Sequence, residues 1–409
     1  MHICFVALSY PVEGGPSSGV GSQVRVLAKS LVDRGHSVSV VTLGANKQIK
    51  TDENQVDIHC VTNSKLHWYA SKLPFIGRIV ALPVRELEYS FAAWRGVRQA
   101  NRNHKIDVVE GTETGMLLIA LTVRSAAVLI RLHGDQYTFD RHTPNVRLTA
   151  AVRFSRMLQR LALRRAQRLI SPSEAHAREI AKELNCDHEA IPIVPNCTDL
   201  EVASARSSGS APQPAVLFVG RFERVKGLLL LLQAARLVVN EFPAARFVLA
   251  GGTHPTLPLE EIHATIDRYS LQQHIELRGY VPAQELVRLY HEALLCVVPS
   301  HYESFGLVAL ESMACGLPVV ASGVGGLAEV VDHDRTGLLV PPGDAEILAK
   351  EIIGLLNDPQ RCRRMGEAGR QRTRERFAIE NSLKRTLAIY EATSNAPSAF
   401  QSNQIASPV

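Results

Sequence analysis

The sequence predicts an α/β protein built from two doubly wound halves. Short apolar runs that suit buried strands alternate with helical patterns along the chain, and this alternation is typical of βαβ units around a parallel sheet. It occurs in two series, separated by a stretch rich in Ser, Ala, Gly and Pro. A chain of 409 residues is also too long for a single hydrophobic core, which favours two domains.

The first series predicts a domain over residues 1–198. Its apolar runs are short, as expected of strands buried on both faces of a sheet, and longer amphipathic stretches separate them. The predicted strands are Ile3–Leu8, Ser37–Leu43, Val56–Val61, Ile106–Glu110, Val128–Leu132, Leu169–Ser171 and Ile191–Val194.

The second series predicts a domain over residues 215–375. The intervening residues 199–214 have little to bury and are predicted to form a linker. Residues 376–392 carry a last helical pattern, and the composition of residues 393–409 predicts a disordered tail. The predicted strands of the second domain are Val216–Val219, Phe247–Ala250, Ile275–Leu277, Leu295–Val298, Val319–Ala321 and Gly337–Val340.

The bulk composition is that of an ordinary globular protein, with 46% hydrophobic residues, 21% charged residues and a formal net charge of +5. The seven cysteines are scattered and form no C-x-x-C pair, so neither a disulfide framework nor a zinc site is indicated. The first residues lack the basic segment and apolar length of a signal peptide, and no apolar run approaches a membrane span. We expect a cytoplasmic protein, either soluble or associated with the inner face of a membrane.

Two carboxylates eight residues apart form the most informative pattern in the chain. Glu303 follows the predicted strand Leu295–Val298, and a helix predicted to begin near Ser304 carries Glu311. Eight helical residues advance about 12 Å and turn about twice, so both carboxylates are expected on one side of the helix. A single ligand could then contact both.

The amides between these carboxylates are predicted to bind an anion. The backbone N–H groups of Phe305, Gly306 and Leu307 lie at the positive end of the predicted helix, where they have no partner within it. Hydroxyls at both ends and phosphates in the middle describe a nucleotide sugar, which would suit this arrangement. The alternative is a plain helix start with one acid complementing the dipole and the other solvated.

The segment Glu303–Glu311, together with Gly220–Gly227 about eighty residues upstream, resembles the donor site of the family 4 retaining glycosyltransferases. The resemblance runs from Ile3 to about Tyr390, with the motifs in the expected order. It implies the GT-B fold, in which two Rossmann-like domains face each other across a deep cleft. It also implies that the last helix crosses back to brace the first domain.

The resemblance assigns roles to the residues of the second domain. Arg221 and Lys226 would stabilise the departing diphosphate, which suits a guanidinium fork and a point charge, and no metal or other cofactor is implied. Glu303 would bind the transferred sugar and Glu311 the ribose of a UDP-sugar or GDP-sugar donor. The contacts in between are Ser304, Phe305, Gly306 and Leu307.

In the first domain the resemblance points to His133 and to a glycine-rich loop. His133 ends the predicted strand Val128–Leu132 in a His-Gly pair, at the sheet edge where ligands of open α/β sheets bind, and it would contact the transferred sugar. Gly19 and Gly21 would lie near the donor phosphates, although a tight strand-to-helix turn is the alternative. Glu110 and Glu113 follow another strand and could face the acceptor.

Two basic tracts are compatible with contact to an anionic membrane. Arginines recur every three or four residues from Arg153 to Arg168, and residues 65–105 mix Lys and Arg with aromatic side chains. An ordinary amphipathic helix with solvated arginines fits the first tract equally well. No nucleic-acid motif accompanies the charge, so nucleic acid is not an expected partner.

The predicted activity is transfer of a hexose-type sugar from a nucleotide-sugar donor to a glycan or glycolipid acceptor, with retention at the anomeric carbon. Two alternatives stay open: a nucleotide-sugar 2-epimerase of the same fold, and a sugar-nucleotide binding module without turnover. The epimerase would need additional acid and base groups facing the sugar, and none is clearly matched. Intact Arg221, Lys226 and Glu303 disfavour the binding module.

Overall fold

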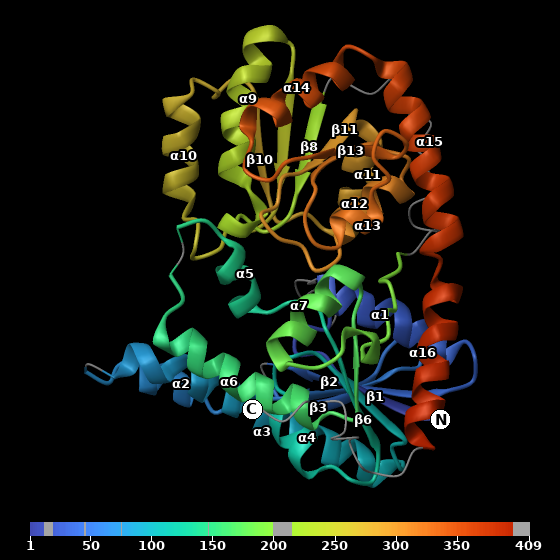
Figure 1. The fold of residues 1–409 in the computed structure, drawn as a ribbon. Helices are drawn as coiled ribbons and strands as arrows, with labels where there is room; N and C mark the ends of the chain where they lie inside the picture. Colours follow the sequence, from blue (N-terminus) through green and yellow to red (C-terminus); the bar gives the residue numbers. More distant parts are fainter. Residues whose placement is uncertain (12–18, 45, 75, 146, 199–214, 396–409) are drawn as a thin grey trace. The chain divides into compact units, whose positions relative to one another are not determined.

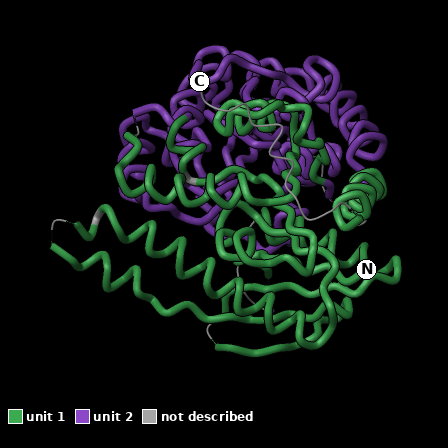
Figure 2. Tube along the Cα trace, turned by 60° about the horizontal axis from the view of Figure 1, so that its bottom comes forward, with its two compact units in different colours: residues 1–141, 146–196, 379–409 green, residues 142–145, 197–378 purple. Residues whose placement is uncertain are grey.

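The computed structural model describes residues 1–11, 19–44, 46–74, 76–145, 147–198 and 215–395. The described residues form two compact units, one made of residues 1–141, 146–196 and 379–409 and the other of residues 142–145 and 197–378 (Figure 2). The predicted linker 199–214 and residues 396–409 of the predicted tail lie outside the described residues. Each unit is an α/β layer structure of its own (Figure 1).

Unit 1 contains a seven-stranded sheet in the order β3-β4-β2-β1-β5-β6-β7. Neighbouring strands pair in parallel except for β3 and β4, which are antiparallel. The strands are β1 (His2–Val6), β2 (Ser37–Leu43), β3 (Gln48–Thr51), β4 (Asp57–Val61), β5 (Val108–Gly111), β6 (Ala127–Arg131) and β7 (Arg168–Ile170). The helices are α1 (Gly19–Val32), α2 (Leu66–Ser71), α3 (Gly77–Asn103), α4 (Leu117–Thr122), α5 (Gln136–His142), α6 (Ala150–Arg165), α7 (Glu174–Leu184), the short η1 (His188–Ala190) and α16 (Ile379–Ser394).

Unit 2 contains a six-stranded, fully parallel sheet in the order β10-β9-β8-β11-β12-β13. Its strands are β8 (Ala215–Val219), β9 (Arg246–Ala250), β10 (Ile275–Gly279), β11 (Leu295–Val298), β12 (Val319–Ser322) and β13 (Gly337–Val340). Its helices are η2 (Arg224–Lys226), α9 (Leu228–Glu241), α10 (Leu259–Arg268), α11 (Ala283–Glu292), α12 (Leu307–Ala314), α13 (Leu327–Val330), α14 (Ala345–Leu356) and α15 (Pro359–Arg376).

The predicted fold class, two doubly wound α/β halves, is confirmed. Twelve of the thirteen predicted strands are present with ends shifted by at most two residues. The exception is Ile191–Val194, of which only Ile193 forms an isolated bridge, to Ser171. Pro192 and Pro195 flank this bridge, and neither can donate a ladder hydrogen bond. Strand β3 was not predicted because its residues are mostly exposed and polar.

The last helix, α16, packs onto the sheet of unit 1. Leu383 and Tyr390 are fully buried among residues of β1 and β2. The Tyr390 hydroxyl donates to Glu110 Oε2 at 2.8 Å, and Arg131 Nη2 donates to Thr386 Oγ1 at 3.1 Å. Residues more than 250 positions apart in the sequence therefore share one buried polar network.

Among the described residues, no helix combines the length and the hydropathy that a membrane crossing requires.

Candidate functional site

The predicted donor residues of unit 2 lie at the point where its strand order reverses. Strands β8 and β11 are neighbours in the sheet, and the chain winds outward from them in opposite directions. In open α/β sheets, ligands bind beyond the carboxyl ends of the strands at this switch point. The loop after β8 carries Arg221 and Lys226, and the loop after β11 carries Glu303.

A close backbone approach holds these two loops together. Gly227 has a φ of +71°, and a Cβ atom at this position would lie 1.9 Å from the carbonyl oxygen of Pro299. Only glycine tolerates both the left-handed backbone and the contact. The amide of His301 also donates to the carbonyl oxygen of Val225 at 2.8 Å, so the loop after β8 is fixed against the loop after β11.

Lys226 and Glu303 form an ion pair across the two loops. Lys226 Nζ lies 2.7 Å from Glu303 Oε1, and the Ser300 hydroxyl donates to the same oxygen at 3.1 Å. The side chains are 19% and 12% exposed, so the pair is partly shielded from solvent and the carboxylate is held in one orientation. The structure thus brings together two of the predicted site residues that lie 77 positions apart in the sequence.

Arg221 is more exposed than Lys226, but its guanidinium is paired with a carboxylate of the same loop. Its Nη2 lies 2.9 Å from Glu223 Oε2, and its side chain is 54% exposed while that of Glu223 is 2% exposed. Arg221 and the buried carboxylate of Glu223 thus form an ion pair through one guanidinium nitrogen. Solvent reaches the rest of the group, which leaves it accessible to a ligand.

The prediction that a helix begins near Ser304 is wrong, because α12 begins at Leu307. Its N-cap residue is Gly306, which has a φ of +110°, a conformation that residues other than glycine rarely adopt. The amides without an intrahelical partner are therefore those of the first turn from Leu307, three residues later than predicted. Ser304 and Phe305 belong to the loop, and the ring of Phe305 is buried against Phe377.

This shift also removes the geometry predicted for the two carboxylates. Glu303 precedes α12, whereas Glu311 lies in its second turn, so they do not share a helix face. The Glu311 carboxylate accepts a hydrogen bond from the buried hydroxyl of Tyr290 at 3.0 Å. Burial of the carboxyl raises the pKa of Glu311 to about 7, although part of the residue is still exposed. The ribose contact assigned to Glu311 stays a prediction.

A third loop, after β12, packs against the backbone of Glu303. The Gly326 amide donates to the carbonyl oxygen of Glu303 at 2.9 Å. A Cβ atom on Gly325, whose φ is +48°, would lie 2.0 Å from that same oxygen. These two glycines therefore let the backbone of one loop lie directly against the other.

In unit 1, His133 lies in the turn between β6 and α5, where the predicted strand end placed it. The residue is 9% exposed. Burial lowers its pKa to about 4 despite the nearby carboxylate of Glu113. The imidazole is therefore neutral at pH 7, so it suits hydrogen bonding to an uncharged hydroxyl better than attraction to an anion.

Glu113 shapes this turn, and the expectation that it faces the acceptor is corrected. Its Oε1 accepts from the amides of His133 at 2.8 Å and Gly134 at 2.9 Å, and Gly134 has a φ of +86°. Burial alone would raise the pKa of Glu113, but the hydrogen bond with His176 and the nearby imidazoles of His133 and His176 hold it at about 2. Sequence reasoning missed this positioning role because His176 lies on a distant helix.

Glu110 does not face an acceptor either. Its carboxylate is buried and accepts from Arg131 Nε at 2.8 Å, from Arg131 Nη2 at 3.1 Å and from the Tyr390 hydroxyl. The two residues that donate these three hydrogen bonds, Arg131 and Tyr390, are themselves buried. Glu110 is therefore part of the support for α16 and not of a ligand site.

Asp135, two residues after His133, forms a buried ion pair with Arg156, in addition to the buried pair of Glu110 and Arg131. Arg156 Nη1 lies 3.2 Å from Asp135 Oδ2, and its Nη2 lies 2.7 Å from Glu183 Oε2. Arg156 therefore belongs neither to a membrane-binding tract nor to a solvated stripe on α6, the two interpretations that the sequence left open. Asp135 also accepts from the amide and hydroxyl of Thr138, which fixes the first turn of α5.

The glycine-rich loop is described only from Gly19 onward, because residues 12–18 lie outside the described residues. Gly19 is the exposed first residue of α1. Gly21 is buried, and a Cβ atom there would lie 2.2 Å from the carbonyl oxygen of Ser9. Close packing of α1 on the end of the first strand is thus a structural reason for Gly21, and the predicted contact with donor phosphates is not tested.

Within the described residues, no group of three or more His, Cys, Asp or Glu side chains is arranged to hold a metal ion.

Comparison with known proteins finds family models and relatives that match this chain. Residues 17–202 match the family model described as Glycosyltransferase Family 4, and residues 203–372 match the model described as Glycosyl transferases group 1. A D-inositol 3-phosphate glycosyltransferase from Segniliparus rotundus is 36% identical over 236 residues, which cover 56% of this chain and 52% of that protein. The match thus spans about half the length of this curated relative.

Solved structures confirm the predicted GT-B fold class. The chain is similar to sucrose-phosphate synthase from Thermosynechococcus elongatus, with a TM-score of 0.77 at 24% identity over 96% of this chain and 98% of the other. It is also similar to HepE from Anabaena, solved in complex with UDP and glucose, with a TM-score of 0.71 at 20% identity over 95% and 99% of the two chains. With the two family models matching consecutive segments from residue 17 to residue 372, the chain belongs to the group 1, family 4 glycosyltransferases.

Proposed function

We propose that this protein transfers a hexose-type sugar from a nucleotide-sugar donor to a glycan or glycolipid acceptor, with retention at the anomeric carbon. The observation that carries the proposal is the Lys226–Glu303 pair at the switch point of the unit 2 sheet. It sets a cation suited to a diphosphate beside a carboxylate suited to sugar hydroxyls. Arg221, anchored by Glu223 on the same loop, adds a second cation.

The chemistry assigned to these groups is electrostatic. When the bond between the anomeric carbon and the diphosphate breaks, negative charge grows on the departing oxygen. Arg221, Lys226 and the first-turn amides of α12 stabilise that charge without having to reorganise. The same cations take the part that a metal ion plays elsewhere, so we propose a reaction without metal. His133, neutral at pH 7, donates or accepts a hydrogen bond at a hydroxyl of the transferred sugar.

The comparisons support this proposal from two sides. The curated relative is named as a glycosyltransferase acting on D-inositol 3-phosphate, and HepE was solved with UDP and glucose. We therefore propose a UDP-sugar or GDP-sugar as donor. We also include contact with an anionic membrane at its cytoplasmic face, because a glycolipid acceptor is itself held in a membrane.

A donor screen by thermal shift tests the site. A nucleotide sugar at 100 times its Kd stabilises the folded protein by about 2.7 kcal/mol, which raises the melting temperature by several degrees. Lys226→Ala is expected to abolish the shift. Lys350→Ala is the matched control, because Lys350 is exposed on α14 and should leave it unchanged. The donor site is refuted if no UDP-sugar or GDP-sugar raises the melting temperature.

Incubation with the labelled donor that gives the largest shift then tests the reaction. Transfer of label to a glycan or glycolipid supports the proposal. Formation of an epimer of the donor sugar, or binding without any product, contradicts it even when the thermal shift is present.

A further inference from the structure

Strongly exposed apolar side chains are concentrated on three helices of unit 1. Among the described residues, eleven of the fifteen large apolar side chains that are most exposed lie either between Leu66 and Phe91 or between Phe154 and Leu161. These two stretches belong to α2, α3, α6 and the connection between α2 and α3. Trp68 is 50% exposed and Met157 is 56% exposed. Soluble proteins rarely gather exposed apolar groups in this way without a partner.

The side chains on the same helices that are both exposed and charged at neutral pH are all cationic. The only acidic residues in α2, α3 and α6 are Glu86 and Glu88, and both are buried. Glu86 accepts from the amide of Gly115, and Glu88 binds Ser64 and His67. A partner on this face therefore meets apolar and positively charged side chains and no exposed carboxylate from these helices.

Along both α3 and α6, exposed apolar side chains come first and basic side chains follow. On α3, Leu87, Phe91, Trp94, Arg98 and Arg102 are spaced three or four residues apart and so occupy one face. The rings of Phe91 and Trp94 stack with centroids 5.9 Å apart, and the Arg98 guanidinium lies 4.7 Å above Trp94. The face is thus apolar in the first part of α3 and cationic in its last part.

Helix α6 repeats this order and lies beside α3. Phe154, Met157 and Leu161 are exposed, and the exposed Arg164 and Arg165 follow in the last turn. Gln159 on α6 donates to Glu86 on α3 at 3.4 Å, and Figure 1 shows the helices α2, α3 and α6 along one border of unit 1. We call the exposed surface of these three helices the docking face. Phe75 and the side chain of Arg78 are not among the groups that the structure describes, so the docking face is defined without them.

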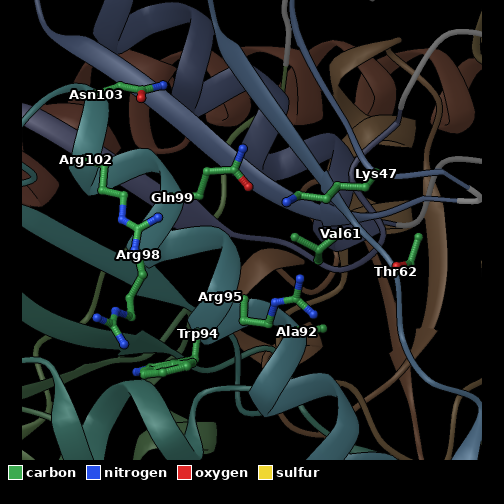
Figure 3. Close-up of a pocket in the computed structure, with 10 residues that line it drawn as sticks. All are labelled: Lys47, Val61, Thr62, Ala92, Trp94, Arg95, Arg98, Gln99, Arg102 and Asn103. Atoms are coloured by element: carbon green, nitrogen blue, oxygen red, sulfur yellow. The ribbon is translucent and has the colours of Figure 1, made fainter.

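A cationic hollow lies where the docking face meets the sheet. It has a volume of about 470 Å³ and is lined by Lys47, Arg95, Arg98 and Arg102, with the indole of Trp94 on one side (Figure 3). In the described part of the chain, these four cations make no ion pair. Four positive groups around an open hollow without a carboxylate favour a phosphate group as the occupant.

We propose that the docking face binds a bilayer of anionic phospholipids, with the exposed apolar side chains among the acyl chains and a lipid head-group phosphate in the hollow. This inference deepens the membrane contact of the proposed function and rests on it for its biological purpose. Aromatic and aliphatic groups flanked by Lys and Arg are what an interfacial helix needs. A second copy of the chain fits less well, because its own docking face would bring arginines against arginines.

Vesicle co-sedimentation with the full chain tests the proposal. We expect binding to vesicles of phosphatidylglycerol mixed with phosphatidylcholine, and much weaker binding to phosphatidylcholine alone. One basic side chain near an anionic surface changes the partition coefficient about fivefold. Arg98→Glu with Arg102→Glu should therefore lower partitioning by about 30-fold or more. The matched control is Arg363→Glu with Arg364→Glu, the same charge change at exposed positions of α15.

Apolar insertion has its own readout through Trp68. Vesicles that contain brominated acyl chains should quench its fluorescence, and Trp68→Phe should remove most of that quenching. Met157→Ser should weaken binding severalfold, whereas Tyr280→Ser, at a position 54% exposed in unit 2, should not.

Three outcomes overturn the proposal: equal binding to neutral and anionic vesicles, equal losses in the control variants, or a dimer in analytical ultracentrifugation that Met157→Ser abolishes. The donor thermal shift is measured separately and involves unit 2 residues. Failure of membrane docking is therefore distinguishable from failure of the proposed function.

Discussion

Replacement of Tyr390 by phenylalanine should destabilise unit 1 and leave unit 2 unaffected. The substitution removes one hydroxyl that donates to Glu110 Oε2 at 2.8 Å, and it leaves the two bonds from Arg131 in place. Burial raises the pKa of Tyr390 well above its ordinary value, so the hydroxyl is a donor at any pH of interest. A hydrogen bond to a charged group contributes about 1.5–3 kcal/mol, and phenylalanine fills nearly the same space. We expect a loss of about 2 kcal/mol.

A second substitution in the same hydrogen-bond network gives a larger loss of stability for comparison. Glu110→Gln removes the charge opposite Arg131, whose side chain is 9% exposed, and leaves that cation buried without a counter-ion. Breaking a buried ion pair from one side costs about 3–5 kcal/mol. Glu110→Gln should therefore destabilise unit 1 more than Tyr390→Phe does, and both effects are too large for a carboxylate that only faces an acceptor.

The assay uses the position of the two tryptophans. Trp68 and Trp94 are the only ones in the chain, and both belong to unit 1, so urea unfolding followed by tryptophan fluorescence reports that unit. Tyr280→Phe is the control, because Tyr280 is 54% exposed in unit 2. A change below about 0.5 kcal/mol for Tyr390→Phe, which is within the range of ordinary surface substitutions, would refute the bracing role of α16.

Three further predictions concern the two sites. Glu303→Gln should leave the affinity for a nucleoside diphosphate within about twofold but remove the extra affinity of the nucleotide sugar, as isothermal titration calorimetry can measure; equal losses for both ligands would contradict the sugar-binding role. Glu113→Gln weakens two charge-assisted bonds to the His133 turn, each contributing about 1.5–3 kcal/mol, so kcat in a transfer assay should fall at least tenfold with little change in donor affinity. The pKa of Glu311 is raised from 4.5 to about 7, so the folded protein holds this proton more tightly than the unfolded chain. The stabilisation that this proton contributes is complete below about pH 4.5 and is lost as pH rises to about 7, a change of up to about 3 kcal/mol. Glu311→Gln should therefore reduce the dependence of the melting temperature on pH in calorimetric melts. An unchanged dependence would show that Glu311 titrates normally.

The strands and the place of the site were predictable because both follow from local sequence. Apolar runs marked nearly every strand, and the carboxyl ends of two of them placed Lys226 and Glu303 in neighbouring loops. The start of α12 was not predictable from the apolar pattern. It depends on the positive φ of Gly306, and a Cβ atom there would lie 2.6 Å from Leu327, a residue from another loop.

The strand-end acids show why roles are harder to predict than positions. In the sequence, Glu110, Glu113 and Glu303 look alike, since each lies at or just after the end of a buried strand. What separates them is the partner: Tyr390 lies 280 positions after Glu110, and Lys226 lies 77 positions before Glu303. A carboxylate whose partners are buried donors of the same core cannot serve a ligand without breaking that core. Only Glu303, paired with a partly exposed lysine at the sheet edge, keeps that option.

The basic tracts illustrate the opposite case, in which burial had to be known before the charge could be interpreted. Periodicity placed Arg156 with its neighbours on α6, yet its guanidinium lies between two carboxylates in the interior, while Met157 next to it is exposed. The alternative of an ordinary amphipathic helix with solvated arginines therefore fails at both positions, because the arginine is buried and the apolar side chain is exposed. Exposed apolar side chains beside cations are stabilised by contact with a partner that is both apolar and anionic, such as a bilayer of anionic lipids. That requirement, more than the number of arginines, favours a membrane as the partner of unit 1.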